Sequence, residues 1–313
     1  MSRAFVFPGQ GSQAVGMGRE LADAFAEARH VFQEVDEALS QNLSKLMFEG
    51  PEETLTLTEN AQPALMAMSV AVIRVLEGQG KMDLGATASF VAGHSLGEYS
   101  ALAAAGTFTL ADTARLLKLR GQAMQKAVPV GVGAMAALLG SEYEQARQIA
   151  AEAAGDQVCE AANDNGAGQV VVSGHKEAVE RAMKLAADKG IKRAVLLPVS
   201  APFHCALMQP AADAMAEALA GVVMNAPKVP LVANVVAAAV TDPEEIRDLL
   251  VRQVTGTVRW REGVLYMKEQ GVHQLVEIGA GKVLSGLARR IDKELSGTAI
   301  GTPADIEAFL ASL

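Results

Sequence analysis

The sequence has little of what would cross-link the chain or anchor it in a bilayer. Only two of its 313 residues are cysteine, Cys159 and Cys205, so a disulfide framework is not expected. No wholly apolar run is longer than VVAAAV at 235–240, which is far short of the roughly 20 residues that span a membrane. The opening MSRAFVFPGQ also lacks the features of a signal peptide. We therefore predict a cytoplasmic protein without a membrane segment and with both cysteines reduced.

Positive charge is scarce as well. Lys and Arg number 27 against 36 Asp and Glu, a formal net charge of −9. Without a basic run or interleaved aromatic and basic residues, no nucleic-acid partner is expected. Half of the residues are apolar, which is enough for one large domain with an insertion, or for two domains.

Strands alternate with helices in the first and last parts of the chain. Short apolar runs at 4–7, 89–93 and 273–278 predict buried strands. Helical periodicity is found at 19–39, 60–80, 98–106, 110–128, 205–220, 243–254 and 259–270, and the last residues from 303 predict a closing helix. This alternation predicts a large α/β domain, similar in class to the α/β-hydrolases, with a mostly parallel sheet formed by residues 1–128 and 200–313.

The middle of the chain has a different order of elements. Strand patterns at 133–140, 158–163, 169–174 and 192–199 alternate with helical patterns at 141–155 and 175–190. The order βαββαβ is that of the ferredoxin-like unit. We therefore predict a small inserted subdomain at 129–199.

Ser95 lies in a motif that is typical of a nucleophile. Gly-His-Ser-Leu-Gly at 93–97 fits G-x-S-x-G and falls between a predicted strand and a predicted helix, the context in which such a serine is exposed on a sharp turn. The alternative is a glycine-rich turn whose serine caps a helix. A nucleophilic serine needs a base, and among the five histidines His204 is the best candidate because it lies on a loop between the two predicted domains.

Arg120 suggests an anionic substrate. Its neighbours three and four positions away on the predicted helix are all apolar (Leu116, Leu117, Ala123 and Met124). A buried guanidinium is costly unless it meets an anion. That anion is either an Asp or Glu elsewhere in the chain or a substrate carboxylate held by the guanidinium fork.

Two glycine-rich segments raise the possibility of a nucleotide site. Residues 9–14 match G-x-G-x-x-A after a strand, but Glu34 and Asp36, at the distance of the expected ribose-binding acid, lie in a helical run. GAGK at 279–282 lacks the first glycine and the final Ser or Thr of a phosphate-binding loop. Neither segment supports a nucleotide cofactor.

Several blocks of sequence together resemble one family. They run from FVFPGQGSQAVGMG at the start through TENAQPAL, GHSLGEYSAL, LRGQAMQ, GAMAALLG, NDNGAGQVVVSG, PVSAPFHCALM and RQVTGTVRW to VEIGAGKVLSGL. In order and spacing they resemble the malonyl-CoA:acyl-carrier-protein transacylases of fatty acid synthesis and the acyltransferase domains of polyketide synthases. The resemblance covers essentially the whole chain.

The resemblance implies a reaction and a catalytic pair. A malonyl group would move from malonyl-CoA to Ser95 and then to the phosphopantetheine thiol of holo acyl carrier protein, without a metal or redox cofactor. His204 would act first as base and then as acid. Gln253 would orient His204 through its backbone carbonyl, which makes a Ser-His dyad in place of a triad.

The resemblance also implies the residues that bind the substrate. Gln10 and Leu96 would form the oxyanion hole with their backbone N–H groups, and Arg120 would hold the malonyl carboxylate. Phe203 and Leu96 resemble the residues of malonyl-selective members, since a ring beside the base would crowd an α-methyl group.

Two other classes of function remain open. An α/β-hydrolase would need an acid after a strand between Ser95 and His204, and none of the aspartates there (Asp112, Asp156, Asp164 and Asp188) follows a clear strand of the large domain. A non-catalytic module that binds acyl carrier protein would not need the reactive residues. An acidic carrier would dock on a local basic patch, for which two clusters are candidates: Lys189, Lys192 and Arg193, or Arg289, Arg290 and Lys293.

Overall fold

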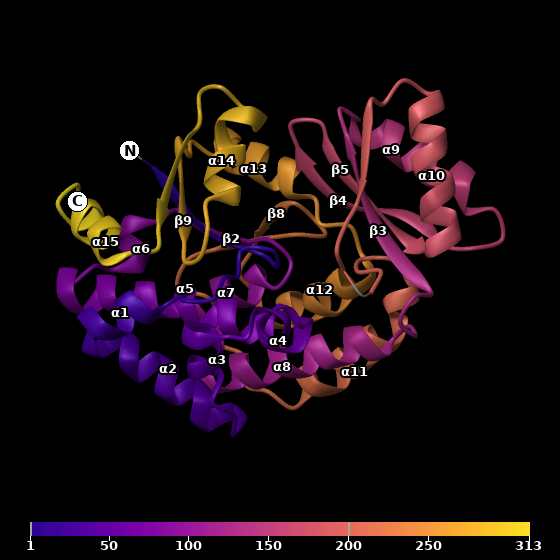
Figure 1. Cartoon of the computed structure of the whole chain (residues 1–313). Helices are drawn as coiled ribbons and strands as arrows, with labels where there is room; N and C mark the ends of the chain where they lie inside the picture. Colours follow the sequence, from indigo (N-terminus) through magenta and orange to yellow (C-terminus); the bar gives the residue numbers. More distant parts are fainter. Residues whose placement is uncertain (1, 200) are drawn as a thin grey trace.

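A computed structural model describes residues 2–199 and 201–313, which form a large domain and a smaller subdomain (Figure 1). The strands of the large domain are β1 (Arg3–Phe7), β2 (Phe90–Gly93), β7 (Leu231–Ala233), β8 (Ala238–Val240), β9 (Gln274–Ile278) and β10 (Ser296–Ile300). Its helices before the subdomain are α1 (Arg19–Ala24), α2 (Ala26–Leu39), α3 (Leu43–Glu49), α4 (Glu52–Thr56), α5 (Thr58–Gly80), α6 (Leu84–Thr87), α7 (Gly97–Ala104) and α8 (Leu110–Lys126). Those after it are the 3₁₀ turn η1 (Ala206–Met208), α11 (Gln209–Ala220), α12 (Pro243–Thr255), α13 (Trp260–Glu269), α14 (Val283–Ile291) and α15 (Pro303–Leu310).

The large sheet has the order β10-β9-β1-β2-β7-β8, and every neighbouring pair is parallel except β7 and β8. Helices cover both of its faces. Along β1, Phe5 and Phe7 pack into the core shared with α5 and α7, whereas Ala4 and Val6 pack into the core shared with α13 and α14. Burial of both faces explains why the parallel strands appear as continuous apolar runs. The predicted α/β class is confirmed.

The smaller subdomain lies to the right in Figure 1. It consists of β3 (Gly133–Leu139), α9 (Tyr143–Ala154), β4 (Cys159–Gly166), β5 (Gln169–His175), α10 (Lys176–Asp188) and β6 (Arg193–Leu196). Its antiparallel sheet has the order β4-β5-β3-β6. The element order βαββαβ is the predicted one. The two predicted segments of the large domain begin at residues 1 and 200, and both of these residues lie outside the described part of the chain.

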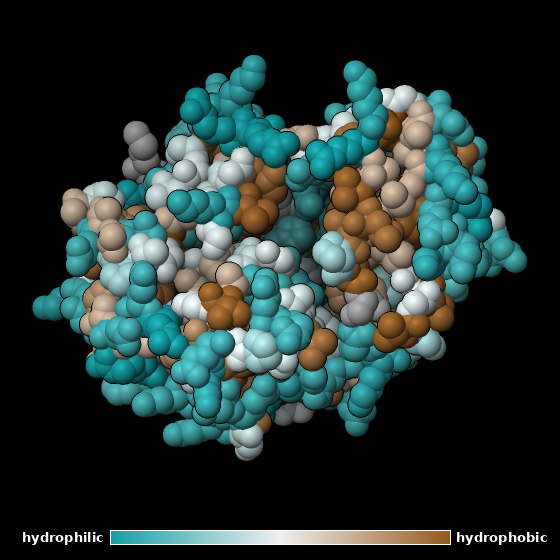
Figure 2. Space-filling view, viewed as in Figure 1, coloured by the Kyte–Doolittle hydropathy of each residue, from teal (hydrophilic) through white to brown (hydrophobic). Residues whose placement is uncertain are grey.

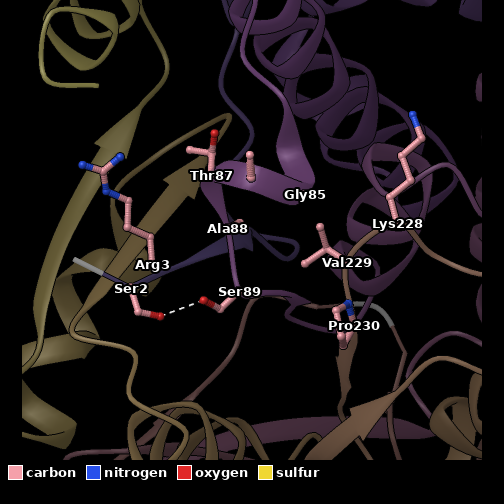
Figure 3. Close-up of a pocket in the computed structure, with 10 residues that line it drawn as sticks. Ser2, Arg3, Gly85, Thr87, Ala88, Ser89, Lys228, Val229 and Pro230 are labelled. Carbon is pink, nitrogen blue, oxygen red and sulfur yellow. Dashed lines mark hydrogen bonds between the residues drawn. The ribbon is translucent and has the colours of Figure 1, made fainter.

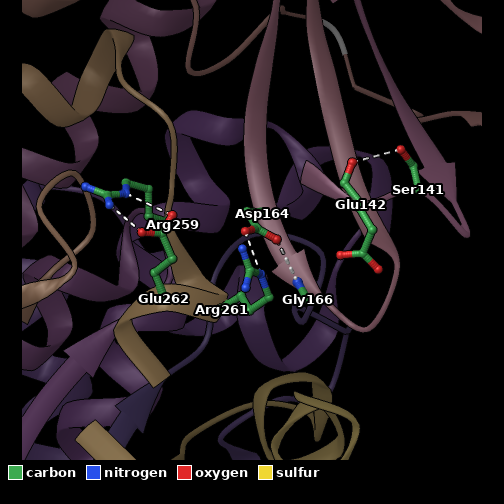
Figure 4. Close-up of polar contacts among 7 residues, drawn as sticks. All are labelled: Ser141, Glu142, Asp164, Gly166, Arg259, Arg261 and Glu262. Atoms are coloured by element: carbon green, nitrogen blue, oxygen red, sulfur yellow. Dashed lines mark hydrogen bonds and ion pairs between the residues drawn. The ribbon is translucent and has the colours of Figure 1, made fainter. Parts of the chain in front are cut away.

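A strand-like contact and an ion pair join the subdomain to the large domain. Asn163 of β4 forms a parallel bridge with Val258. Close by, the buried carboxylate of Asp164 accepts a hydrogen bond from Nε of Arg261 at 2.9 Å. Figure 4 shows this pair beside a second one, between Arg259 and Glu262, on the large domain. Because α12 ends only three residues before Val258, these contacts tie β4 to the helix that carries Gln253.

Some elements differ from those expected. The helix predicted at 19–39 breaks at Phe25, whose extended backbone separates α1 from α2. Strands β7, β8 and β10 were not predicted, and the first two have three residues each. No helix among the described residues is long and apolar enough to span a membrane.

Candidate active site

A sharp turn between β2 and α7 holds Ser95 in a left-handed conformation, with φ of 54°. Such a conformation is strained for a residue other than glycine and is typical of functional sites. Two glycines make the turn possible. A Cβ on Gly93 would collide with the backbone of Gly97, and a Cβ on Gly97 would collide with the carbonyl of Phe7 in β1. The glycines therefore serve close backbone packing, which brings Ser95 to the carboxyl end of the parallel strands.

His204 reaches Ser95 from the loop that precedes η1. Its Nε2 lies 2.7 Å from Oγ of Ser95, and its Nδ1 lies 2.9 Å from the backbone oxygen of Gln253. A carbonyl oxygen can only accept a hydrogen bond, so Nδ1 carries the proton and Nε2 is free to accept the proton of the serine hydroxyl. The third member is a backbone carbonyl and not the carboxylate that a triad hydrolase requires.

Burial keeps His204 in its neutral form. The side chain is almost fully buried, and this desolvation, helped by the positive charge of Arg120, lowers the pKa of His204 to about 3. At neutral pH the imidazole is therefore available as a general base.

Arg120 of α8 points its guanidinium at Ser95 from the buried side of the site. It is 1 % exposed. Nη1 donates to Oε1 of Gln62 at 2.8 Å, and Nη2 donates to Oε1 of Gln253 at 2.9 Å and to Oγ of Ser95 at 3.2 Å. Among the described residues no Asp or Glu forms an ion pair with Arg120. Of the two partners that the sequence allowed, an internal acid in direct contact with the guanidinium is thus not found among the described residues. The guanidinium carries a buried positive charge beside the hydroxyl and has only neutral partners.

Three buried polar residues that the sequence analysis did not single out hold this arrangement in place. Asn234, which follows β7, accepts a hydrogen bond from the N–H of Ser95 and donates one to the carbonyl of Gly93. Glu98 of α7 accepts from Asn234 and Gln253, and Gln62 of α5 binds Arg120. Gln62 and Glu98 could have been identified from the sequence because each is a polar residue on the buried face of an otherwise apolar helix. The signal for Asn234 is its position at the end of a short apolar run.

The two residues expected to form an oxyanion hole come from different parts of the large domain. Gln10 is on the loop after β1, and Leu96 is the N-cap of α7. The backbone N–H groups of Gln10 and Leu96 donate no hydrogen bond to any other described residue. Both residues line the same cavity as Ser95.

That cavity has a volume of about 450 Å³ and lies between the large domain and the subdomain. It is polar on the side of Ser95, His204 and Arg120. Its apolar wall comes from Met124 of α8, Met135 of β3, and a run of residues before the base (Leu197, Pro198, Val199 and Phe203). Figure 2 shows the molecule hollowed between its two parts, with hydrophobic side chains on the wall of the subdomain. An acyl chain ending in a carboxylate would meet both kinds of surface.

The side chains of the other residues considered from the sequence form no hydrogen bond with Ser95 in the described part of the chain. His94 lines the cavity, but its Nε2 binds Asn165 and not Ser95. In the first basic cluster Lys189 pairs with Glu152, whereas Arg289 and Arg290 are exposed on α14. No group of three or more His, Cys, Asp or Glu among residues 2–199 and 201–313 is arranged to hold a metal ion.

A second pocket, of about 270 Å³, lies at the opposite edge of the sheet. It is lined by residues that precede β1, β2 and β7, including Ser2, Ser89 and Lys228, and the hydroxyls of Ser2 and Ser89 are 2.7 Å apart (Figure 3). Sites in open α/β sheets form at the carboxyl ends of the strands. Ser95 lies at that edge, and this second pocket does not.

The chain is similar to proteins of one family along its whole length. A model of the acyl transferase domain matches residues 4–297. The chain is 48% identical over 307 residues to the malonyl CoA-acyl carrier protein transacylase of Escherichia coli K12, with 98% of each chain covered. It is 43% identical over 311 residues to the enzyme of the same name from Bacillus subtilis 168, with 99% of this chain and 96% of the relative covered.

Solved structures agree with these matches. The crystal structure of an acyl-carrier-protein-S-malonyltransferase from Bartonella henselae superposes with a TM-score of 0.97 at 59% identity and covers 100% of this chain and 99% of that one. A second match comes from the structure of a type II PKS acyl-carrier protein in complex with its malonyl-transacylase. The TM-score is 0.96 at 45% identity, with 100% of this chain and 100% of the matched chain covered.

Proposed function

The chain belongs to the acyl transferase domain family, and on that premise we propose that it transfers a malonyl group from malonyl-CoA to the phosphopantetheine thiol of holo acyl carrier protein. The relatives named above support both substrates, because their names state the malonyl donor and the carrier acceptor. The product would supply fatty acid synthesis. Two free, buried cysteines suit a reducing cytoplasm.

The first half-reaction forms a malonyl ester on Ser95. Nε2 of His204 removes the hydroxyl proton while Oγ of Ser95 attacks the thioester carbon. The oxyanion then accepts hydrogen bonds from the N–H groups of Gln10 and Leu96, aided by the positive end of α7. When the tetrahedral intermediate collapses, the carbon–sulfur bond breaks and the proton on His204 passes to the departing CoA thiol. Protons and electrons balance within this step.

The second half-reaction runs the same path with a different thiol. His204 takes the proton from the phosphopantetheine thiol, the sulfur attacks the malonyl ester, and Ser95 regains its proton from His204. The kinetics are therefore ping-pong. Both the thioester and the oxygen ester are reactive enough for a Ser-His dyad with an oxyanion hole to transfer the acyl group between them. No metal or redox cofactor is needed.

One observation carries the choice of substrate: the buried guanidinium of Arg120 contacts Oγ of Ser95, and no Asp or Glu among the described residues forms a direct ion pair with it. The malonyl carboxylate, two carbons from the reacting carbonyl, supplies an anion that the guanidinium can bind directly. Phe203 forms part of the wall next to the base and leaves little room for a branch on the intervening carbon.

The test is a transfer assay that separates carrier from water as acceptor. Malonyl-CoA is incubated with the protein in the presence and absence of holo acyl carrier protein, and both the malonyl carrier and free malonate are measured by mass spectrometry. The proposal expects rapid formation of malonyl carrier and little free malonate. Rapid malonate formation without the carrier would instead support hydrolysis.

A further inference from the structure

Glu98 is a buried acid next to the site that the proposed reaction does not use. It is 0 % exposed and lies on α7, three residues after Ser95. One carboxylate oxygen, Oε2, accepts hydrogen bonds from the backbone N–H of Asn234 at 2.9 Å and from Nε2 of Gln253 at 3.1 Å. The other oxygen, Oε1, has no partner among the described residues. A buried carboxylate oxygen without a donor is costly while the group is charged.

The side-chain amide of Gln253 links Glu98 to Arg120. Its Nε2 donates to Glu98, and its Oε1 accepts from Nη2 of Arg120. The other two buried acids of the described chain are occupied elsewhere: Asp164 pairs with Arg261, and Glu277 binds the first backbone N–H groups of α14. Glu98 is thus the buried acid placed to balance the positive charge of Arg120.

Few other charged or titratable groups face Glu98. From α8 it meets Arg120, and from its own helix Tyr99, whose ring also lies under the Arg120 guanidinium at 5.7 Å. From α12 and the residue after β7 it meets the neutral amides of Gln253 and Asn234. The faces of β1 and β2 toward α7 are apolar, and α5 contributes the uncharged Gln62 near Arg120. His204 contacts the backbone oxygen of Gln253, and Glu98 contacts its side-chain amide.

On the basis of the malonyl transfer proposed above, we infer that Glu98 is an exchangeable counter-charge: it is ionised in the free enzyme and binds one proton from solvent when the malonyl carboxylate reaches Arg120. Two carboxylates would otherwise share one buried guanidinium, and like charges there raise the cost of ionising the second acid. The proton bonds to Oε1, because Oε2 already accepts two N–H donors. Only this O–H bond forms. Glu98 is a positioning residue in this account, since it acts on the substrate through Gln253 and Arg120.

The electrostatics of the free site suit such an exchange. Burial raises the pKa of Glu98 to about 7, while its hydrogen bonds and the charge of Arg120 oppose the rise. A small change in charge at Arg120 therefore alters the protonation of Glu98 in the physiological range. Since the transfer from CoA to Ser95 itself neither takes up nor releases a proton, any net uptake during loading reports on another group.

The experiment counts protons during loading of the full-length enzyme. Malonyl-CoA is mixed with wild type and with Glu98→Gln at pH 7.5 in weakly buffered solution with a pH indicator, and the malonyl-enzyme formed is quantified by intact mass. Glutamine has the shape of the protonated acid but does not titrate. Acetyl-CoA, brought to the same extent of loading, is the control that lacks the carboxylate.

We expect wild type to take up between roughly half and one proton per malonyl group, and Glu98→Gln and the acetyl control to take up close to none. The equilibrium extent of malonyl loading should also fall with rising pH between 7 and 8 in wild type, by up to about tenfold relative to Glu98→Gln. Equal proton counts for malonyl and acetyl loading of wild type would overturn the inference, even if Glu98→Gln did not fold. Absence of any malonyl-enzyme in wild type would overturn the proposed function itself, which distinguishes the two failures.

Discussion

Nδ1 of His204 lies 2.9 Å from the backbone oxygen of Gln253. A backbone carbonyl does not titrate in this pH range, and it cannot turn away from the ring unless α12 moves. It therefore fixes both the tautomer and the direction of the ring. The Ser-His pair thus depends on one helix terminus for the orientation that a carboxylate supplies in a triad.

Replacing the base should slow loading without unfolding the protein. His204 has φ of 58°, a left-handed conformation that asparagine tolerates, so His204→Asn is the suitable change. We expect the rate of malonyl-Ser95 formation in rapid-quench experiments to fall by roughly 10²- to 10⁴-fold. The exposed His273, changed to Asn, is the control and should retain the wild-type rate. Loading of His204→Asn at that rate would rule out its role as base.

Arg120 should decide between malonyl and acetyl groups. Arg120→Lys keeps the charge but loses the planar fork, and we expect the ratio of kcat/KM for malonyl-CoA over acetyl-CoA to fall by roughly 10- to 100-fold. Arg115, on the same helix but exposed and paired with Asp112, provides the matched control as Arg115→Lys. An unchanged ratio in Arg120→Lys would show that the carboxylate binds elsewhere.

The pH dependence of Ser95 reactivity should lack the usual histidine limb. Because the pKa of His204 is lowered to about 3, the base stays neutral from pH 8 to pH 5. The rate of inactivation by phenylmethylsulfonyl fluoride should therefore show no decline centred near 6.5. In Arg120→Ala the positive neighbour is removed, so the pKa of His204 should rise and an acid limb should move to higher pH. A limb near 6.5 in wild type would contradict the buried, neutral base.

The same shift affects stability. An unfolded histidine gains a proton below about pH 6.5 that folded His204 does not bind. Titration of His204 therefore leaves the free energy of unfolding unchanged above pH 6.5. Below that pH the unfolded state binds the extra proton, so the free energy of unfolding decreases as pH falls toward 3.

Two glycines allow a test of the packing behind the turn. Gly97→Ala would place a methyl group against the carbonyl of Phe7, and we expect the free energy of unfolding to drop by about 1–3 kcal/mol. Gly286, in the exposed part of α14, has open space at its Cβ, so Gly286→Ala should raise it by about 0.5–1 kcal/mol. Denaturant titration of both variants measures the difference. Equal effects would show that the close approach at Gly97 is not needed.

Much of the fold could be predicted because the main signals are local. The elbow around Ser95 and the βαββαβ order depend on turn residues and periodicity within short windows. By contrast, β7 is only three residues long, and β10 is an edge strand with three exposed residues. Neither is long or regular enough to give an apolar pattern.

The site was predictable to a different extent. Arg120 could be singled out because its helical neighbours are apolar, and Ser95 because of its motif. Glu98, Asn234 and Gln62 act through partners far away in sequence, and the pairing of Glu98 with Asn234 spans 136 positions. No local pattern specifies such contacts, so they become visible only when the sheet brings the carboxyl ends of its strands together.

The central claim is that Ser95 carries the acyl group between the two thiols. Intact-protein mass spectrometry after mixing with malonyl-CoA, followed by addition of holo acyl carrier protein, tests it most directly. We predict an increase in mass by one malonyl group in wild type, no increase in Ser95→Ala, and complete discharge when the carrier is added. A malonyl adduct that survives in Ser95→Ala, or one that the carrier does not discharge, would contradict the account.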